Sequence, residues 1–203
     1  MGGLIARLGV FGGTFDPPHI GHLILASEAI DQLNLSRVLW VLTPEPPHKK
    51  GQVITALPFR SRMLRAALVG NSNFEFSDVD INRQPPHYAV DTVKLLRQEN
   101  HAAELIYLMG SDSLHDLPNW HNPFEFVCAC DALGVMCRPN NDIDLTEIEG
   151  VIPGVSAKVQ FIRAPLLEIS SYEIRNRIAL HRPYRYFLPD EVNNLIQKER
   201  LYQ

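Results

Sequence analysis

The segment Gly12–His22, which reads GGTFDPPHIGH, constrains the fold more than any other part of the sequence. It follows the apolar run Leu8–Phe11, which predicts a buried strand. It leads into apolar residues at helical spacing: Ile20, Leu23, Ile24, Ile30 and Leu33. Two adjacent glycines let the backbone approach a ligand, and the first turn of a helix offers unpaired N–H groups at the positive end of its dipole. A strand, a tight glycine turn and a helix start in this order predict a phosphate-binding site.

Two histidines lie at the start of this predicted helix. His19 and His22 are three residues apart, so both are expected to project from one side of the first turn and to donate hydrogen bonds to phosphoryl oxygens. A zinc pair is the alternative, because two histidines at this spacing can chelate a metal from a helix. No Cys or carboxylate neighbour completes a ligand set, so no metal ligand is predicted within the protein.

The same eleven residues match the signature Gly-Gly-Thr-Phe-Asp-Pro-x-His-x-Gly-His, so the chain resembles the nucleotidyltransferase superfamily. These enzymes pass adenylyl or cytidylyl groups from a nucleoside triphosphate to a phosphate or alcohol acceptor. The resemblance implies that His19 and His22 act on the transferring phosphoryl group. It also implies ATP contacts from Gly12, Gly13, Thr14 and Phe15. Class I aminoacyl-tRNA synthetases share the sequence His-Ile-Gly-His, but the chain has no Lys-Met-Ser-Lys-Ser-like segment and is too short for anticodon recognition.

The order of predicted elements indicates the fold class. A second apolar strand, Arg37–Leu42, follows the first helix, and a strand, a helix and a strand in this order form a βαβ unit with parallel strands. Further strands are predicted at Phe74–Ile81, Glu104–Met109, Ala132–Cys137 and Lys158–Ile162, and further helices near Pro58, after His87, after Ser170 and over Pro189–Arg200. We therefore expect an α/β, Rossmann-like, doubly wound parallel sheet with helices on both faces. Residues 1–203 are predicted to form a single nucleotidyltransferase domain with a C-terminal helical portion at about 165–203.

Two loops are candidates for binding the acceptor substrate. The loop Thr43–Gly51 contains Pro-Pro-His-Lys, which resembles the corresponding loop of nicotinate mononucleotide adenylyltransferases and implies that Lys49 contacts a substrate phosphate. In that family the residues before a later helix commonly read Ser-Tyr-Thr, and the threonine helps to hold the pyridine carboxylate. Here Tyr88 and Ala89 stand in the second and third of these positions, so a hydroxyl is lost, although a backbone N–H can still serve. The resemblance implies that both residues bind nicotinate mononucleotide.

The predicted strand Glu104–Met109 is followed by Gly110-Ser111-Asp112-Ser113-Leu114 and, six residues after Leu114, by Trp120. This pattern also resembles the nicotinate mononucleotide enzymes, and it implies that Gly110 and Asp112 contact ATP and that Trp120 stacks on the pyridine ring. The alternatives are an N-cap role for Asp112 or Ser113 and a half-buried packing role for Trp120. The helix that begins near Pro58 is expected to turn three residues inward: Phe59, Met63 and Ala66. Its arginines, Arg60, Arg62 and Arg65, are expected to lie elsewhere on the helix. Arg60 and Met63 nevertheless keep the Arg-x-x-Met spacing of the family.

The segment Ile169–Arg175 carries a second phosphate-binding pattern. Ser170 followed by Glu173 is typical of a capping box, so a helix is predicted to start here with Ile174, Ile178 and Leu180 packed inward. The segment resembles the Ile-Ser-Ser-Thr-x-Ile-Arg motif of the superfamily, with Tyr172 in place of threonine. The resemblance implies that Ser170 and Ser171 bind ATP and that Arg175 acts on the leaving phosphates.

Composition narrows the cellular setting. The net charge of −4 argues against a general nucleic-acid binder. No signal peptide and no apolar run of about 20 residues are apparent, so we expect a cytoplasmic protein without a membrane partner. The cysteines Cys128, Cys130 and Cys137 are expected to be reduced, buried, structural thiols. A homo-oligomer is left open.

Together, the resemblances imply transfer of the adenylyl group of ATP to nicotinate mononucleotide, with Mg²⁺ bridging phosphates and deamido-NAD and pyrophosphate as products. The alternatives are an enzyme that prefers nicotinamide mononucleotide, another adenylyltransferase of the superfamily, or a nucleotide-binding module without turnover. No Gly-x-Gly-x-x-Gly fingerprint is present, so an NAD-dependent dehydrogenase is disfavoured.

Overall fold

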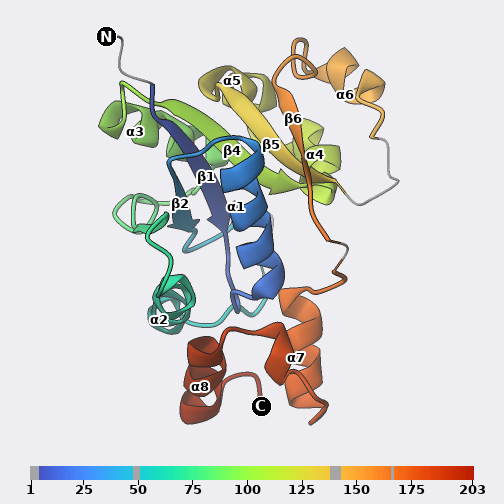
Figure 1. Ribbon diagram of the computed structural model, residues 1–203. Coiled ribbons are helices and arrows are strands. Elements are labelled where there is room, and N and C mark those ends of the chain that lie inside the picture. Colours follow the sequence, from blue (N-terminus) through green and yellow to red (C-terminus); the bar gives the residue numbers. More distant parts are fainter. Residues whose placement is uncertain (1–4, 48–50, 138–142, 166) are drawn as a thin grey trace.

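The structure is a computed structural model that describes residues 5–47, 51–137, 143–165 and 167–203. Its described strands form one six-stranded parallel sheet in the order β3-β2-β1-β4-β5-β6 (Figure 1). The strands are β1 (Arg7–Gly13), β2 (Arg37–Leu42), β3 (Phe74–Ser77), β4 (Glu104–Gly110), β5 (Ala132–Cys137) and β6 (Val159–Arg163). The strand order reverses between β1 and β4, and ligands of such sheets bind in the crevice beyond the carboxyl ends at that point. The predicted Rossmann-like sheet is confirmed.

Helices cover both faces of the sheet, as predicted. They are α1 (Ile20–Gln32), α2 (Leu57–Leu68), α3 (Ala89–Glu99), α4 (Ser111–Asp116), α5 (Pro123–Ala129), α6 (Thr146–Val151), α7 (Ser171–Ala179) and α8 (Asp190–Glu199), with short 3-10 turns at Leu117–Asn119 and Arg185–Phe187. One apolar cluster joins the sheet to α3, α5 and α6, and another joins it to α1 and α2. Within the described ranges no helix has both the length and the apolar character needed to cross a bilayer.

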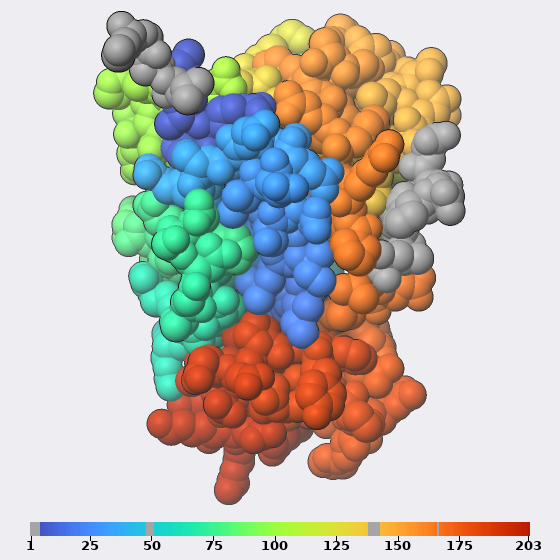
Figure 2. Space-filling view, viewed as in Figure 1, coloured from blue at the N-terminus to red at the C-terminus, as the bar shows by residue number. Residues whose placement is uncertain are grey.

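The C-terminal helices α7 and α8 lie beyond the carboxyl end of β1, where they form the base of the molecule in Figure 1. They pack against α2 through a separate apolar cluster that includes Met63, Ile174, Ile178, Val192 and Ile196. In the space-filling view this segment, in red, lies directly against the N-terminal segments, in blue (Figure 2). This packing brings the second motif to the edge of the sheet where the glycine turn lies.

Several predicted details differ from the structure. β3 ends at Ser77 instead of Ile81, because it pairs only with β2 and the chain then turns, with the Asn82 N–H donating to the Asp78 carbonyl. The buried face of α1 is formed by Leu25, Ala26 and Ala29. The predicted residues Ile20, Leu23, Ile24 and Ile30 are only half-buried, because small alanines allow the middle of the helix to approach the sheet. Leu180 is exposed, since it follows the last turn of α7.

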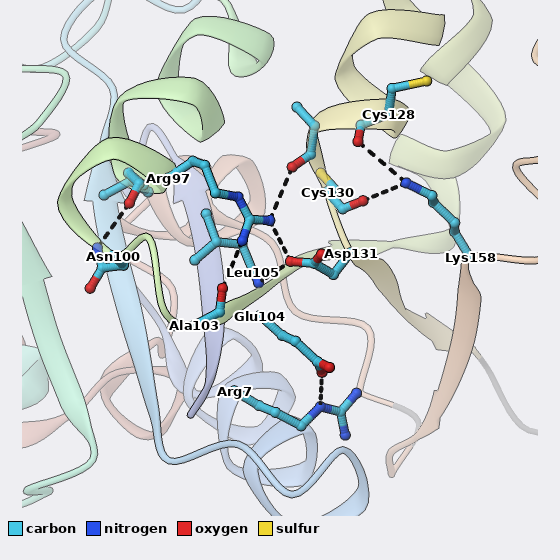
Figure 3. Close-up of polar contacts among 12 residues, drawn as sticks. Arg7, Arg97, Asn100, Ala103, Glu104, Leu105, Cys128, Cys130, Asp131 and Lys158 are labelled. Atoms are coloured by element: carbon cyan, nitrogen blue, oxygen red, sulfur yellow. Dashed lines mark hydrogen bonds and ion pairs between the residues drawn. The ribbon is translucent and has the colours of Figure 1, made fainter. Parts of the chain in front are cut away.

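Polar contacts fix the amino ends of the strands, away from the predicted site (Figure 3). Arg97 donates hydrogen bonds to the Ala103 carbonyl at 2.7 Å and pairs with the Asp131 carboxylate. The Lys158 ammonium donates to the carbonyls of Val127 at 2.8 Å and Cys130 at 2.6 Å, which stabilises the carboxyl end of α5.

None of the three cysteines is in a disulfide, and only Cys130 is buried. Burial raises the pKa of its thiol to about 12, so this thiol stays protonated. Cys128 is exposed and Cys137 is half-buried, so the predicted burial is wrong for Cys128.

Candidate nucleotide-binding site

The glycine turn at the end of β1 is packed so closely that side chains would not fit. A Cβ atom at Gly12 would lie 2.7 Å from the Tyr107 hydroxyl oxygen, and one at Gly13 would lie 2.9 Å from the Phe15 ring. Phe15 adopts a left-handed φ of 45° and packs its ring against Phe11 at 5.5 Å between ring centroids. The turn is therefore rigid, and it carries Thr14 and Asp16 as buried polar residues.

The two histidines lie side by side, as predicted. The rings of His19 and His22 are stacked with centroids 3.7 Å apart, and His22 Nδ1 accepts a hydrogen bond from the His19 backbone N–H at 3.1 Å. A neutral His22 that accepts at Nδ1 carries its proton on Nε2, so it presents a donor on the other side of the ring. His19 is only 6% exposed, and burial lowers its pKa to about 4. His19 is therefore neutral at pH 7.

The second motif docks directly on the glycine turn. The Ser171 hydroxyl donates to the Pro17 carbonyl at 2.8 Å, although these residues are 154 positions apart in the sequence. The Arg175 guanidinium donates to the Asp16 carbonyl at 2.7 Å. Ser170 is the N-cap of α7, and its hydroxyl accepts from the Glu173 N–H at 3.1 Å, as predicted. Of the predicted capping box only this half is observed, because the Glu173 carboxylate pairs with Arg177.

One pocket lies between the two motifs. Its lining consists of Thr14, Phe15, Asp16, His22, Gln52, Val53, Ile54, Ser171 and Arg175. The N-terminal turns of α1 and α7 supply His22 and Ser171 to this lining, so two helix dipoles and a guanidinium act on the same space. This arrangement can bind a polyphosphate.

A second pocket adjoins the first across the start of α1. It is lined by Gly21, Ile24, Gly110, Ser111, Asp112, Met136, Cys137, Ala164, Pro165, Leu167 and Ile169. Gly110 and Asp112, which were predicted to contact ATP, therefore lie together in it. The N-cap of α4 is Gly110, so neither Asp112 nor Ser113 has the alternative N-cap role.

The predicted acceptor-binding residues lie near one another on the α3 side of the sheet. Tyr88 is the N-cap of α3, Ala89 is its first residue, and both pack with Trp120 against the apolar cluster that includes Tyr107 and Phe126. Trp120 meets Tyr107 edge to face with ring centroids 6.1 Å apart, and it remains partly exposed. Lys49, predicted to touch a phosphate, lies outside the described residues.

Arg60 is the largest error of the sequence-based interpretation. It was expected to lie away from the buried face of α2, but it is only 2% exposed. Its guanidinium donates to four carbonyls, those of Thr14 at 3.1 Å, Thr43 at 2.9 Å, Pro44 at 2.7 Å and Thr55 at 2.8 Å. Burial lowers the pKa of Arg60, and the nearby Asp16 carboxylate acts in the opposite direction. The planar fork of five N–H donors suits these converging carbonyls, so Arg60 joins the loops that follow β1 and β2.

Sequence reasoning also missed a second buried pair. Asp80 is 2% exposed and accepts hydrogen bonds from Arg83 at 2.9 Å and from Thr92 at 2.8 Å. Arg83 also donates to the Tyr88 carbonyl at 3.1 Å, so the pair holds the start of α3 in place. The only signal in the sequence was an acidic residue among the apolar residues at the end of a predicted strand.

Comparison with known proteins identifies the family. Residues 10–177 match the cytidylyltransferase-like family. A protein of Thermomicrobium roseum named "probable nicotinate-nucleotide adenylyltransferase" is 45% identical over 199 residues, which cover 98% of this chain and 92% of that protein. The chain belongs to the nicotinate-nucleotide adenylyltransferase family. A family member of the same name from Exiguobacterium sibiricum is 36% identical over 97% of this chain and 98% of that protein.

Solved structures agree with this family assignment at the level of the fold. Plasmodium falciparum nicotinic acid mononucleotide adenylyltransferase complexed with NaAD superposes with a TM-score of 0.77 at 20% identity, covering 97% of both chains. The family and enzyme class that the sequence motifs predicted for this nicotinate-nucleotide adenylyltransferase family member are thus confirmed.

Proposed function

We propose that the chain transfers the adenylyl group of ATP to nicotinate mononucleotide, with deamido-NAD and pyrophosphate as products. The observation that carries the proposal is the docking of α7 on the glycine turn, through Ser171 on Pro17 and Arg175 on Asp16. This contact gives one pocket donors from two helix starts, which suits a triphosphate held along its length. Membership of the nicotinate-nucleotide adenylyltransferase family supports the choice of acceptor.

The chemistry we propose is a direct in-line displacement. The phosphate of the mononucleotide is already a nucleophile at neutral pH, so it attacks the α-phosphorus of ATP without a general base or a covalent intermediate. Catalysis then consists of alignment and charge stabilisation. His19 and His22 donate to the transferring phosphoryl group, and His19 does so as a neutral imidazole. Arg175 stabilises the charge that develops on the leaving pyrophosphate.

The other predicted contacts divide between the two substrates. We propose that ATP is bound by Gly12, Gly13, Thr14, Phe15, Gly110, Asp112, Ser170 and Ser171. Of these residues, Thr14, Phe15 and Ser171 line the first pocket, and Gly110 and Asp112 line the second. For nicotinate mononucleotide we propose contacts with Tyr88, Ala89 and Trp120, and a contact between its phosphate and Lys49. Because Ala89 is the first residue of α3, its backbone N–H is available to a carboxylate even though the side chain has no hydroxyl.

Mg²⁺ is proposed to enter with ATP. When bound, it neutralises phosphate charge. Asp16 is the acidic residue in the lining of the first pocket, and both of its carboxylate oxygens already accept hydrogen bonds, from Tyr202 at 2.7 Å and from the Thr55 N–H at 3.1 Å. This favours an ion held mainly by the phosphates of ATP. We also propose a cytoplasmic location, because none of the three cysteines is in a disulfide, which is typical of a reducing compartment.

The test of direct transfer is the balance of products. Purified protein with Mg·ATP is expected to release no pyrophosphate until nicotinate mononucleotide is added, and then to form pyrophosphate and deamido-NAD in equal amounts. A burst of pyrophosphate with ATP alone, stoichiometric with protein, would contradict direct transfer because it requires an adenylyl-protein. ATP binding without release under either condition would favour a nucleotide-binding module instead.

A further inference from the structure

The last residues of the chain fold back toward Asp16, which lines the first pocket. α8 ends at Glu199, and Arg200 and Tyr202 both adopt left-handed backbone conformations, with φ of 52° and 66°. The Leu201 N–H donates to the Ile196 carbonyl at 3.0 Å, which closes a turn after the helix. Figure 1 shows the C-terminus between α7 and α8. This turn directs the Tyr202 side chain toward the glycine turn at the start of the chain.

The Tyr202 hydroxyl donates a hydrogen bond to Asp16 Oδ1 at 2.7 Å, across 186 positions of sequence. Burial raises the pKa of Tyr202, and the Asp16 carboxylate raises it further, so the hydroxyl stays protonated and remains a donor at neutral pH. The other carboxylate oxygen of Asp16 accepts from the Thr55 N–H at 3.1 Å. Both oxygens of a residue that is only 4% exposed are therefore fixed.

Asp16 connects this hydrogen bond to the catalytic machinery. Its backbone carbonyl accepts the hydrogen bond from Arg175 Nη1 at 2.7 Å, and Arg175 lines the first pocket. With the Asp16 side chain fixed on both oxygens, its carbonyl is fixed as well, and the guanidinium keeps one orientation. Without the Tyr202 hydroxyl, Asp16 Oδ1 would lose its donor in a buried site, which favours rearrangement of the residue that holds Arg175.

We infer that Tyr202 is a positioning residue for adenylyl transfer, which acts through Asp16 to hold the guanidinium of Arg175 against the phosphates of ATP. The inference rests on the proposed function and adds to it a residue from the last turn of the chain. A purely structural role, as an anchor for α8, is the competing explanation. Tyr202 also contacts α2, with its hydroxyl 3.9 Å from Met63 Sδ.

The test compares Tyr202→Phe with Tyr186→Phe, a control that removes a hydroxyl from a tyrosine that is 85% exposed in the same C-terminal region. The ring of Tyr202 stays in place in the variant, so its packing is kept. A displaced catalytic group lowers turnover by up to about 100-fold, so we expect kcat of Tyr202→Phe to fall about 10- to 100-fold. KM for nicotinate mononucleotide is expected to stay within about threefold, since that substrate does not contact Arg175 in our proposal. The Tyr186→Phe control is expected to match wild type.

A double-mutant cycle separates positioning from anchoring. If Tyr202 acts through Arg175, Tyr202→Phe will have little further effect on kcat in an Arg175→Ala background. If Tyr202 only anchors α8, the two substitutions will lower kcat by independent factors, or Tyr202→Phe will lower Tm and leave kcat unchanged. Either of these results, or an unchanged kcat in Tyr202→Phe, would overturn the inference.

A binding measurement distinguishes failure of this inference from failure of the proposed function. If wild-type protein does not turn over nicotinate mononucleotide, the proposed function is wrong, and Tyr202 is then judged by the Kd for Mg·ATP. We expect that Kd to rise about fivefold in Tyr202→Phe and not to rise further in the Arg175→Ala background. An equal Kd in wild type and Tyr202→Phe would overturn the inference whatever the acceptor is.

Discussion

The contact between Gly12 and Tyr107 predicts a specific defect and a specific rescue. In Gly12→Ala the new Cβ would lie 2.7 Å from the Tyr107 hydroxyl oxygen, closer than such atoms approach in proteins. Tyr107 cannot easily move, because it is 7% exposed and its ring packs edge to face on Phe126 with centroids 4.9 Å apart. Overpacking of this kind costs about 1–3 kcal/mol. For a chain of this size, Tm falls by about 2–4 °C for each kcal/mol, so we expect a loss of roughly 2–12 °C.

Removing the hydroxyl should relieve the defect. In a Tyr107→Phe background, the nearest ring atom to the Cβ would be Cζ at 3.6 Å, which is an ordinary van der Waals contact. Gly12→Ala should therefore cost little in that background, with a coupling of at least about 1 kcal/mol between the two substitutions. Pyrophosphate release should follow the same pattern, since Gly12 belongs to the turn that carries Thr14 and Phe15.

Thermal unfolding of the four proteins measures this coupling directly. Gly150→Ala is the matched control, because a Cβ at Gly150 meets no atom within 4 Å. Gly150 lies in α6, where alanine is favoured over glycine by up to about 1 kcal/mol, so this substitution should leave Tm unchanged or raise it slightly. If Gly12→Ala lowers Tm equally in the wild-type and Tyr107→Phe backgrounds, the close packing of the glycine turn under Tyr107 is not the cause, and the reasoning fails.

Three further predictions concern charge and hydrogen bonding. Because burial lowers the pKa of His19 from 6.5 to about 4, the unfolded chain takes up the proton first, so His19 costs up to about 3 kcal/mol of stability as the pH falls from 6.5 toward 4. Between about pH 7 and pH 5, Tm should therefore fall less in His19→Gln than in wild type. An equal fall in both proteins would refute the destabilising role of buried His19. Arg60→Lys leaves buried carbonyls without donors and should lower the free energy of unfolding by about 2–4 kcal/mol in denaturant titrations. Arg62→Lys, at an exposed ion pair with Glu199, should lower it by at most about 1 kcal/mol. Similar losses in the two variants would contradict the buried role of Arg60. His22→Ala should lower kcat by about 10²–10³ with an unchanged circular dichroism spectrum, and wild-type turnover in this variant would contradict the proposed mechanism.

The central strands could be predicted from the sequence because each is buried on both faces. The predicted strands Arg37–Leu42 and Ala132–Cys137 have the bounds observed for β2 and β5. A short continuous apolar run between turn residues is typical of a strand in a buried parallel sheet. The edge strand β3 was predicted four residues too long. Its end is set by pairing with a single neighbour, which local sequence does not encode.

The helix starts within the two predicted phosphate-binding motifs could be predicted because each motif is local in the sequence. The supporting residues could not be predicted, since Arg60, Asp80 and Tyr202 contact loops distant in the sequence. Asp80, for example, also accepts a hydrogen bond from the Thr43 hydroxyl at 3.3 Å. An arginine on an amphipathic helix usually faces solvent, and nothing near Arg60 in the sequence indicates four converging carbonyls. Tyr202 lies 186 positions from its partner Asp16. Such residues become recognisable only when the fold places backbone carbonyls and carboxylates around them.

The most direct test of the account compares kcat/KM for nicotinate mononucleotide and nicotinamide mononucleotide, measured as pyrophosphate release from Mg·ATP. The α3 start offers a backbone N–H at Ala89, which suits a carboxylate acceptor, so we predict that the acid is preferred by at least about tenfold. Faster release with the amide would contradict the proposed acceptor. Release with neither, in a protein that still binds Mg·ATP, would mean that the pocket between α1 and α7 binds the nucleotide but that neither mononucleotide is the acceptor.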